Sequence, residues 1–497
     1  MVDMNQGTVF STAVEIETAR KVDDEQLAPS WIASLQAEIP SVRLHSDFDT
    51  LLEHSRDRLP FGRFRHRSKQ LTGALPSAVV EPTNVAEVEE IVQFAQRNNL
   101  AVIPYGSGSG VLGGTVPFCG ELIIALNRMN RILEIDETNN VVRAEAGLNG
   151  GALEVALKER GYSSGHSPQS LEMSTVGGWA ACRGSGQCSS RYGNIENMIV
   201  GMKVVLPSGE LMDVRHVPRR SVGPSLIELF IGSEGTLGLV VEVTLKIWPL
   251  PPKEIDGTVA FPGVESGLHA IRKVMQLGLR PAVIRLYDRS ESERWGGDDL
   301  PDDPDAVICM FEFHGLAGVA EAEFEAALRI FATHGGVIID DGPIRRWKSV
   351  RFESHSDAFV DAGGYYDTIE VAAPWSRLVE MYNTIRSAIS DKYPEVMLNA
   401  HWSHAYSDGA CMYMTTKIPA MPDEAALPIH ASVWEIVMRH CLDMGGTISH
   451  HHGIGYFRNK WIIEELNAGH KVLGDLKRAL DPGNLFNPGK LGLTDKD

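Results

Sequence analysis

The chain has 497 residues, of which 43% are hydrophobic and 22% charged, and this predicts two or more domains of ordinary globular composition. Its formal net charge of −19 at pH 7 disfavours nucleic acids and anionic membrane surfaces as partners. Its six cysteines lack C-x-x-C spacing, so they indicate reduced thiols rather than a disulfide framework or a zinc site.

Targeting signals are not recognisable in the sequence. The residues from Met1 to Gly7 lack the basic and apolar regions of a signal peptide, and no run of eighteen apolar residues occurs. The C-terminal Thr-Asp-Lys-Asp matches no peroxisomal or retention signal. We therefore expect a cytoplasmic protein with no membrane span.

Residues 1–73 predict a mainly helical lead-in. A run of basic residues between Arg63 and Lys69 is most simply interpreted as a solvated helix face. From residue 74 to 252 strands alternate with helices, which predicts an α+β domain. Its expected elements are a helix over Val85–Asn98, a helix from Gly151, and strands over Ala101–Ile103, Glu121–Leu126, Asn140–Ala146, Met198–Leu206, Leu211–Val214 and Leu239–Ile247.

The stretch Pro104–Gly114 is rich in glycine and follows a predicted strand. Consecutive N–H groups in such a turn form a concave nest that binds anions, phosphates above all. The stretch is neither a Walker loop, because no Lys-Ser/Thr follows, nor a convincing dinucleotide fingerprint. Two more glycine turns, around Gly177 and Gly235, lie in the same domain-sized span, which favours a large diphosphate cofactor held by several loops.

Pro249-Leu-Pro-Pro252 predicts a stiff boundary to a second domain, residues 253–446. We expect this domain to be α+β with an antiparallel sheet. Its predicted strands are Thr258–Phe261, Ala282–Leu286, Ala306–Phe313, Thr368–Ala372 and Ala410–Thr416, and its predicted helices are Ser266–Leu277, Gly318–His334, Trp375–Asp391 and Leu427–Asp443. A C-terminal segment, residues 447–497, begins with Thr-Ile-Ser-His-His-His-Gly.

Four motifs together resemble the FAD-binding domain of the vanillyl-alcohol oxidase superfamily, of the PCMH type: Pro104–Gly110, Ser170–Trp179, Tyr192–Glu196 and Gly232–Gly238. Within it the chain most resembles the alkylglycerone-phosphate (alkyl-dihydroxyacetone-phosphate) synthases, from about residue 45 to 490. The resemblance implies a two-part FAD-binding domain with an α+β cap domain, and a C-terminal segment that returns to the FAD domain.

The resemblance also implies which segments line FAD. They are Pro104, Tyr105, Gly106, Ser107, Gly108, Ser109 and Gly110; Gln169, Ser170, Leu171, Glu172, Met173, Ser174 and Thr175; Cys182, Arg183, Gly184 and Ser185; and Glu234, Gly235, Thr236, Leu237, Gly238, Leu239 and Val240. Arg183 either adds charge-assisted bonds to the pyrophosphate or pairs with a surface acid. No histidine follows the first loop closely, so we expect non-covalent FAD.

Tyr406 matches the synthases' catalytic tyrosine by position. A phenol is a poor base at neutral pH unless neighbours stabilise its anion. The family's required histidine loop is intact as Ser449–Gly453 and offers such neighbours. In an extended loop, His450 and His452 would project to one side and leave His451 on the other.

Arg285 interrupts an apolar strand and matches a family arginine that activity needs. Its partner is either Asp288 or another structural acid, or an anionic group of substrate or cofactor. Arg351 is a weaker candidate for binding the substrate's anion. A metal on His401, His404, His450 and His452 is a rival hypothesis. Related 2-hydroxyacid dehydrogenases carry a metal, but their ligand positions correspond here to Ala405, Met412 and His451, so we predict no metal site.

The primary hypothesis is an FAD-dependent oxidoreductase acting on a hydroxylated, anionic small molecule, with Tyr406 taking the hydroxyl proton as hydride leaves for the flavin. The alternative is synthase activity, which exchanges an acyl for an alkyl group through a flavin–substrate adduct. A short acidic turn, Gly296–Asp305, replaces the synthases' long cap insertion, and Tyr-Ser-Asp-Gly replaces their Tyr-Asp-Ala-Gly. Both changes argue against a long-chain substrate. The electron acceptor is not identified by the sequence, and a homodimer is one of the assemblies it leaves open.

Overall fold

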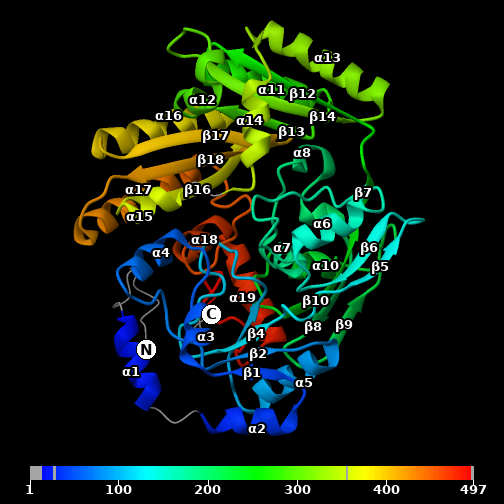
Figure 1. The fold of residues 1–497 in the computed structure, drawn as a ribbon, viewed down its shortest axis with the longest axis vertical. Coiled ribbons are helices and arrows are strands. Elements are labelled where there is room, and N and C mark those ends of the chain that lie inside the picture. The colour runs from blue at the N-terminus through cyan, green and yellow to red at the C-terminus, as the bar shows by residue number, and fades with distance from the viewer. Residues whose placement is uncertain (1–13, 26–28, 354–355, 494–497) are drawn as a thin grey trace.

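A computed structural model describes residues 14–25, 29–353 and 356–493. It has two parts, with the predicted FAD domain below and the predicted cap above in Figure 1. The α+β class with an antiparallel cap sheet is confirmed. Part of the predicted lead-in, residues 1–13 and 26–28, lies outside the described residues, as do residues 494–497 of the C-terminal segment.

The lower part holds two main sheets. The first has the order β1-β2-β4-β3 and is parallel except for β1, and the second is antiparallel with the order β5-β6-β10-β8-β9. Strands β11 and β7 form a separate pair. The bounds are β1 Arg43–His45, β2 Ala78–Glu81, β3 Val102–Tyr105, β4 Leu122–Ala125, β5 Ile132–Asp136, β6 Val141–Glu145, β7 Tyr162–Ser163, β8 Ile199–Val205, β9 Leu211–Val214, β10 Leu239–Lys246 and β11 Trp248–Pro249.

Ten helices among the described residues belong to this half of the chain: α1 Ile16–Glu25, α2 Ser30–Glu38, α3 Phe48–Glu53, α4 Pro60–Arg67, α5 Val85–Arg97, α6 Gly150–Lys158, α7 Val176–Cys182, α8 Ser189–Tyr192, α9 Ile195–Met198 and α10 Leu226–Phe230. Helix α5 shows why these elements form. Asn84 caps its N-terminus by accepting the N–H of Glu87, and its apolar face is buried against the sheets. The predicted helix over Val85–Asn98 is therefore confirmed.

Two predictions about this half need correction. Strand β5 was not predicted, and β1, in the expected helical lead-in, pairs antiparallel with β2. The basic run does not form a purely solvated face either. In α4, Arg63 forms an ion pair with Asp357 at 2.7 Å and Arg67 with Asp423 at 3.5 Å, so this helix binds the cap.

The cap contains one seven-stranded antiparallel sheet with the order β15-β12-β14-β13-β17-β18-β16. Helices α11, α13, α16 and α17 cover one of its faces and share its largest apolar core, while α12 and α14 cover part of the other. The strands are β12 Lys253–Phe261, β13 Val283–Tyr287, β14 Val307–Gly315, β15 Val337–Ile338, β16 Tyr365–Pro374, β17 Met397–Ala405 and β18 Gly409–Ile418. The helices are α11 Val264–Gln276, α12 Arg289–Gly296, η1 Gly297–Asp299, α13 Ala317–Thr333, α14 Gly342–Val350, α15 Asp357–Asp361, α16 Trp375–Lys392 and α17 Asp423–Asp443.

Strands β15 and β17 were not predicted, and α17 begins four residues before the predicted start, with Pro428 inside it. Helices α18 Asn459–Leu466 and α19 Ala468–Leu480 follow. The chain then runs back beside the first sheet, where the N–H of Val102 donates to the carbonyl of Leu485 and the N–H of Asn487 donates to the carbonyl of Val102. Among the described residues, no helix is long and apolar enough to cross a membrane.

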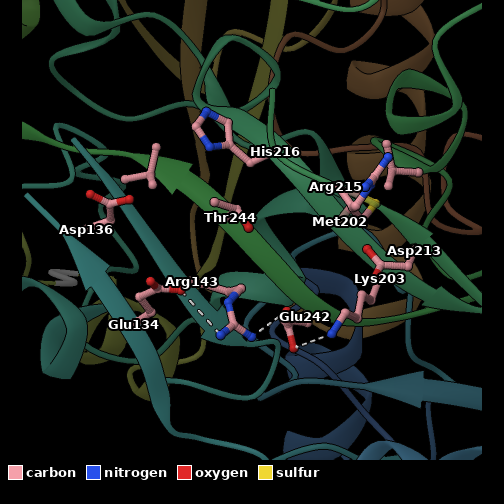
Figure 2. Close-up of a pocket in the computed structure, with 12 residues that line it drawn as sticks. Glu134, Asp136, Arg143, Met202, Lys203, Asp213, Arg215, His216, Glu242 and Thr244 are labelled. Atoms are coloured by element: carbon pink, nitrogen blue, oxygen red, sulfur yellow. Dashed lines mark hydrogen bonds and ion pairs between the residues drawn. The ribbon is translucent and has the colours of Figure 1, made fainter. Parts of the chain in front are cut away.

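A hollow of about 290 Å³ lies on the open face of the five-stranded sheet (Figure 2). None of the predicted site residues lines it. Its charges are largely paired with one another, since Arg143 bonds Glu134 and Glu242, and Lys203 bonds Glu242. This hollow is therefore not the candidate functional site.

Candidate functional site

The inner face of the cap sheet, which α11, α13, α16 and α17 leave uncovered, carries a row of polar and aromatic side chains. Side chains alternate along a strand, so the apolar neighbours Ile284, Ala400 and Met412 enter the helix-covered core, while residues one position away face the other side. Antiparallel register aligns the inward residues across four strands. The row consists of Tyr287, His401, Tyr413 and Glu370.

Tyr406 lies just beyond the end of β17, in the turn to β18, where its N–H donates to the carbonyl of Gly409 at 2.8 Å. Its Oη contacts His450 Nε2 at 2.7 Å and donates to Asn194 Oδ1 at 3.1 Å. Burial raises the pKa of the Tyr406 phenol well above its usual range, and burial together with His451 lowers the pKa of His450 to about 3. At neutral pH a protonated phenol therefore faces a neutral imidazole.

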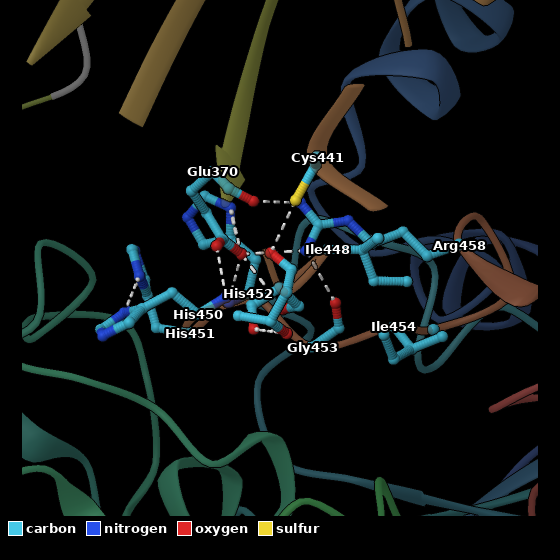
Figure 3. Close-up of polar contacts among 12 residues, drawn as sticks. Glu370, Cys441, Ile448, His450, His451, His452, Gly453, Ile454 and Arg458 are labelled. Carbon is cyan, nitrogen blue, oxygen red and sulfur yellow. Dashed lines mark hydrogen bonds and ion pairs between the residues drawn. The ribbon is translucent and has the colours of Figure 1, made fainter. Parts of the chain in front are cut away.

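The predicted arrangement of the histidine loop is wrong. His450 and His451 meet through their Nδ1 atoms at 3.0 Å, whereas His452 turns towards Glu370 (Figure 3). The reason is that Glu370 accepts the backbone N–H groups of both His450 and His452, which bends the loop. An extended loop would have made the side chains alternate.

Glu370 and Arg458 form the buried support of this loop. Both side chains are 0% exposed, and Arg458 Nη1 donates to Glu370 Oε1 at 3.0 Å. Burial alone would raise the pKa of Glu370, but Arg458 and the neighbouring loop hold it well below its usual range. The carboxylate is thus charged and fixes the loop's backbone. The sequence interpretation missed Glu370, although an acid within the apolar strand Thr368–Ala372 is the same kind of signal that identified Arg285.

The structure decides between the structural partners proposed for Arg285. Asp288 accepts the N–H of Glu291 as the N-cap of α12 and does not contact Arg285. Instead, Arg285 donates to Tyr287 Oη at 2.9 Å and lies 2.8 Å from His401 Nε2. Among the ion pairs of the described residues, none includes Arg285.

Arg351 shares an aromatic neighbour with Arg285. The guanidinium carbon of Arg285 lies 5.2 Å from the ring centroid of Trp347, and that of Arg351 lies 5.6 Å from the same centroid. Arg351 also takes part in no ion pair within the described part of the chain. Two cations that lack acidic partners therefore flank one tryptophan beside the polar row, and such a place suits an anion.

The first glycine loop has the features that a phosphate nest needs. Between Gly106 and Val111, no backbone N–H donates to an acceptor in the described residues. Two of its positions need glycine, because a Cβ at Gly106 would lie 2.4 Å from Thr175 Oγ1 and Gly108 has φ +61°. Backbone N–H groups are thus free to bind an anion, and the residues present fit the pyrophosphate of FAD.

The second predicted segment, Gln169–Thr175, lies against this loop through Thr175, whose Oγ1 also caps α7. Ser174 accepts a hydrogen bond from Trp179 Nε1, so its side chain is engaged in the fold, and Glu172 and Met173 are exposed. Arg183, at the end of α7, is half-exposed and lies 3.6 Å from Glu196 and 3.8 Å from Glu228. Of the two alternatives for Arg183, binding the pyrophosphate or pairing with a surface acid, the structure contains the second.

The last predicted segment, Glu234–Val240, connects three parts of the chain. The carboxylate of Glu234 accepts the N–H groups of Ile454 and Gly455, just after the histidine loop. Asn487 donates to the carbonyls of Glu234 and Gly114. The glycine loop, this segment and the histidine loop are therefore neighbours, although about 340 residues of sequence separate the first from the last.

Asn194 and Ser189 bridge the two halves of the site, and the sequence interpretation assigned no role to either. Ser185 Oγ donates to Asn194 Oδ1 at 2.8 Å, and the same oxygen accepts from Tyr406. Ser189 Oγ contacts His404 Nδ1 at 2.7 Å. The motif Tyr192-Gly-Asn-Ile was the available signal. Because His401 and His404 are engaged by Arg285 and Ser189, the four-histidine metal set is not assembled.

Comparison with known proteins identifies the family of this chain. Residues 76–215 match the FAD binding domain family, and residues 250–491 match the family described as FAD linked oxidases, C-terminal domain. The chain is 30% identical to an alkyldihydroxyacetonephosphate synthase of Caenorhabditis elegans over 83% of this chain and 75% of that protein. It is 29% identical to an uncharacterized FAD-linked oxidoreductase, YgcU, of Escherichia coli O157:H7, over 93% of this chain and 97% of that protein.

Among solved structures, one of an alkyldihydroxyacetonephosphate synthase superposes with a TM-score of 0.79 at 24% identity, covering 96% of this chain and 88% of that one, and this likeness concerns the fold. The predicted resemblance and the predicted FAD cofactor are confirmed. The chain belongs to the FAD-linked oxidase family.

Proposed function

We propose that this protein oxidises a hydroxyl group of a small anionic molecule, using FAD. The observation that carries the proposal is the 2.7 Å contact between Tyr406 Oη and His450 Nε2, together with Arg285 and Arg351, which form no ion pair with any acid of the described residues. This arrangement supplies a proton acceptor and an anion site in one place.

The proton path follows from the protonation states. Tyr406 is a protonated phenol and His450 a neutral imidazole. For the transfer, the single hydroxyl hydrogen of Tyr406 turns from Asn194 Oδ1 to His450 Nε2 and passes to it as Tyr406 takes the proton of the substrate's hydroxyl. A phenol with a raised pKa is a poor base alone, and the transfer to histidine removes the need for a free phenolate. The Nδ1 contact between His450 and His451 lets the charge formed on His450 be shared.

Bound FAD would accept the hydride that leaves the substrate carbon bearing the hydroxyl group. The backbone N–H groups of Gly106–Val111 would hold its pyrophosphate. Thr175 packs closely against Gly106, and Gly235 packs closely against Pro104 at the start of the loop. Asn194 links the segment Cys182–Ser185 to Tyr406, so it would set the distance between the cofactor and the proton acceptor. We propose that the link to FAD is non-covalent, which release of the flavin on acid precipitation would test.

The anion site supports a substrate that carries a carboxylate or a phosphate. Arg285 is held in place by Tyr287 and His401, so its guanidinium is oriented before an anion binds. Arg351, which also lies against the ring of Trp347, is the second residue that we propose binds the anion. The remaining role of His401 is to orient Arg285 rather than to bind a metal.

Anaerobic mixing of the purified flavoprotein with a panel of alcohols and 2-hydroxy acids tests this function. We expect bleaching of the flavin by members that carry an anion, and no bleaching by their uncharged analogues. Slow reoxidation in air would identify a dehydrogenase and fast reoxidation an oxidase. If no compound bleaches the flavin, the proposed oxidation is wrong.

Synthase activity is the second candidate, because a relative of 30% identity carries that name and the tyrosine and histidine loop are in place. The acidic turn Gly296–Asp305 argues for a compact substrate, since Arg346 ties it to α14 through Asp299 at 3.1 Å. Incubation with acyl-dihydroxyacetone phosphate and a long-chain alcohol distinguishes the two functions. An ether product without flavin bleaching would replace the first proposal by the second.

A further inference from the structure

A cysteine and two histidines converge beside Tyr406. One ring nitrogen of His450, one of His451 and Sγ of Cys411 all lie within 4.8 Å of one another. Cys411 is fully buried on the inner face of β18, opposite Ala372 on one side and Ser403 on the other. The proton-transfer scheme above uses His450 but leaves Cys411 without a role.

The spacing suits tetrahedral coordination. Zinc bonds sulfur at about 2.3 Å and imidazole nitrogen at about 2.0–2.1 Å, which places neighbouring ligand atoms about 3.3–3.6 Å apart. The Nδ1 atoms of His450 and His451 are already 3.0 Å apart, so a small opening would admit an ion. A thiolate with two imidazoles is a soft donor set that selects zinc over magnesium.

The surrounding charges permit a cation here. Arg458 is paired with Glu370, and the guanidinium of Arg285 is engaged by Tyr287 and His401. Glu370 also accepts the backbone N–H of His450, so the side of this residue that faces the carboxylate is already engaged. Figure 3 shows His450 and His451 pointing towards each other and away from this carboxylate.

We propose that Cys411, His450 and His451 form a binding site for Zn²⁺, and that zinc inhibits the enzyme. Of the positions that correspond to the metal ligands of related dehydrogenases, only His451 takes part. The claim that zinc inhibits the enzyme, unlike the claim that zinc binds, rests on the proposed function. If zinc uses Nε2 of His450, it displaces Tyr406, and if it uses Nδ1, the hydrogen is fixed on Nε2. In both cases Tyr406 loses its proton acceptor.

Binding is tested by titrating the FAD-loaded protein with zinc chloride in a calorimeter, without substrate. We expect one zinc per chain, and an affinity at least about tenfold weaker in Cys411→Ser, because a thiolate is a far better zinc ligand than a hydroxyl. The control is Cys119→Ser, at an exposed cysteine, which should bind zinc like the wild type. Wild-type affinity in Cys411→Ser would overturn the proposed site.

X-ray absorption at the zinc edge of the wild-type complex gives a result that needs no variant, should Cys411→Ser fail to fold. We expect one sulfur at about 2.3 Å together with imidazole nitrogens, and a shell of nitrogen and oxygen only would overturn the site.

The inhibitory half is tested by anaerobic flavin reduction with and without zinc. We expect the rate to fall at least tenfold and to recover with EDTA, whereas Cys411→Ser should keep its own zinc-free rate. A zinc-loaded wild type that reduces its flavin at the zinc-free rate would overturn the inhibition. If no substrate reduces the flavin even without zinc, the proposed function fails and the calorimetric result still decides the site.

Discussion

The two walls of the candidate site are built in different ways. The wall formed by Gly106–Val111 offers backbone N–H groups, and its chemistry depends on the absence of side chains. The cap wall offers side chains that come from three strands, a turn and a loop: Arg285, His401, Glu370, Tyr406 and His450. A nest of N–H groups recognises a phosphate whatever else the ligand carries, while a set of side chains can be adapted to one reaction. We therefore propose that the first wall holds the cofactor and that the second wall selects the substrate.

The largest expected effect is on the cap wall. Glu370→Gln leaves Arg458 as a buried cation without an ionic partner. It also replaces, by an NH2 donor, one of the two oxygens that accept the loop N–H groups of His450 and His452. We expect a loss of about 3–5 kcal/mol in the free energy of unfolding, measured by urea denaturation. Glu291→Gln, at another buried acid of the cap, is the matched control. Equal losses in the two variants would contradict the special role of Glu370.

Arg285→Met should weaken substrate binding and leave FAD binding intact. Loss of one charge-assisted contact costs about 1.5–3 kcal/mol, which corresponds to roughly a 10- to 100-fold weaker apparent affinity for substrate in flavin-bleaching titrations. Arg386→Met, on α16 away from the site, serves as the control. If Arg285→Met instead released FAD, the division of tasks between the two walls would be wrong.

Acid should destabilise the cap wall through its histidines. Burial lowers the pKa of His450 and His451 to about 3 and of His452 to about 4, whereas the unfolded chain binds these protons near pH 6.5. The contribution of these neutral histidines to the free energy of unfolding is therefore fully present above pH 6.5. It is lost as the pH falls towards 4, because the unfolded chain then binds protons that the folded chain does not. We expect His452→Gln to make the fall in unfolding free energy shallower by at most about 1.4 kcal/mol per pH unit. The free energies of unfolding of the wild type and of His452→Gln are measured in urea at pH 7, 6 and 5. An equal dependence on pH in the two proteins would contradict this prediction.

The smallest effect is expected on the cofactor wall. In Gly106→Ala the new Cβ meets Thr175 Oγ1, which disturbs the loop and the cap of α7. We expect FAD to bind about fivefold more weakly, since a lost cap costs about 1 kcal/mol. Gly318→Ala, where a Cβ meets nothing within 4 Å, should bind FAD normally. If Gly106→Ala altered substrate preference but not FAD affinity, the comparison would be reversed.

The sequence predicted the cofactor wall better than the cap wall for a physical reason. A nest is a local property of a short glycine-rich run, so Pro104–Gly114 is recognisable without any knowledge of the fold. The row Tyr287, His401, Tyr413 and Glu370 depends on strand register, which sequence does not reveal. Strand β17 was not predicted because it has no continuous apolar run. Its apolar residues Leu398, Ala400 and Trp402 alternate with polar residues that face the site, such as Asn399 and His401.

The histidine loop shows a second kind of difficulty. Its residues were identified from the resemblance, but the directions of its side chains were wrong, because a carboxylate 80 residues earlier in the sequence bends the backbone. Asn194 was missed because its role arises only where Tyr406 and Ser185 meet. Residue identity was thus predictable, and the contacts between distant segments were not.

The central claim is that Tyr406 and His450 together take the hydroxyl proton of the substrate. The most direct measurement is the rate of anaerobic flavin reduction in Tyr406→Phe at saturating substrate, by stopped flow. General base catalysis contributes about 100- to 10,000-fold, so we predict a rate at least 100-fold below wild type, with substrate affinity and FAD content nearly unchanged. Flavin reduction in Tyr406→Phe at the wild-type rate would contradict the account.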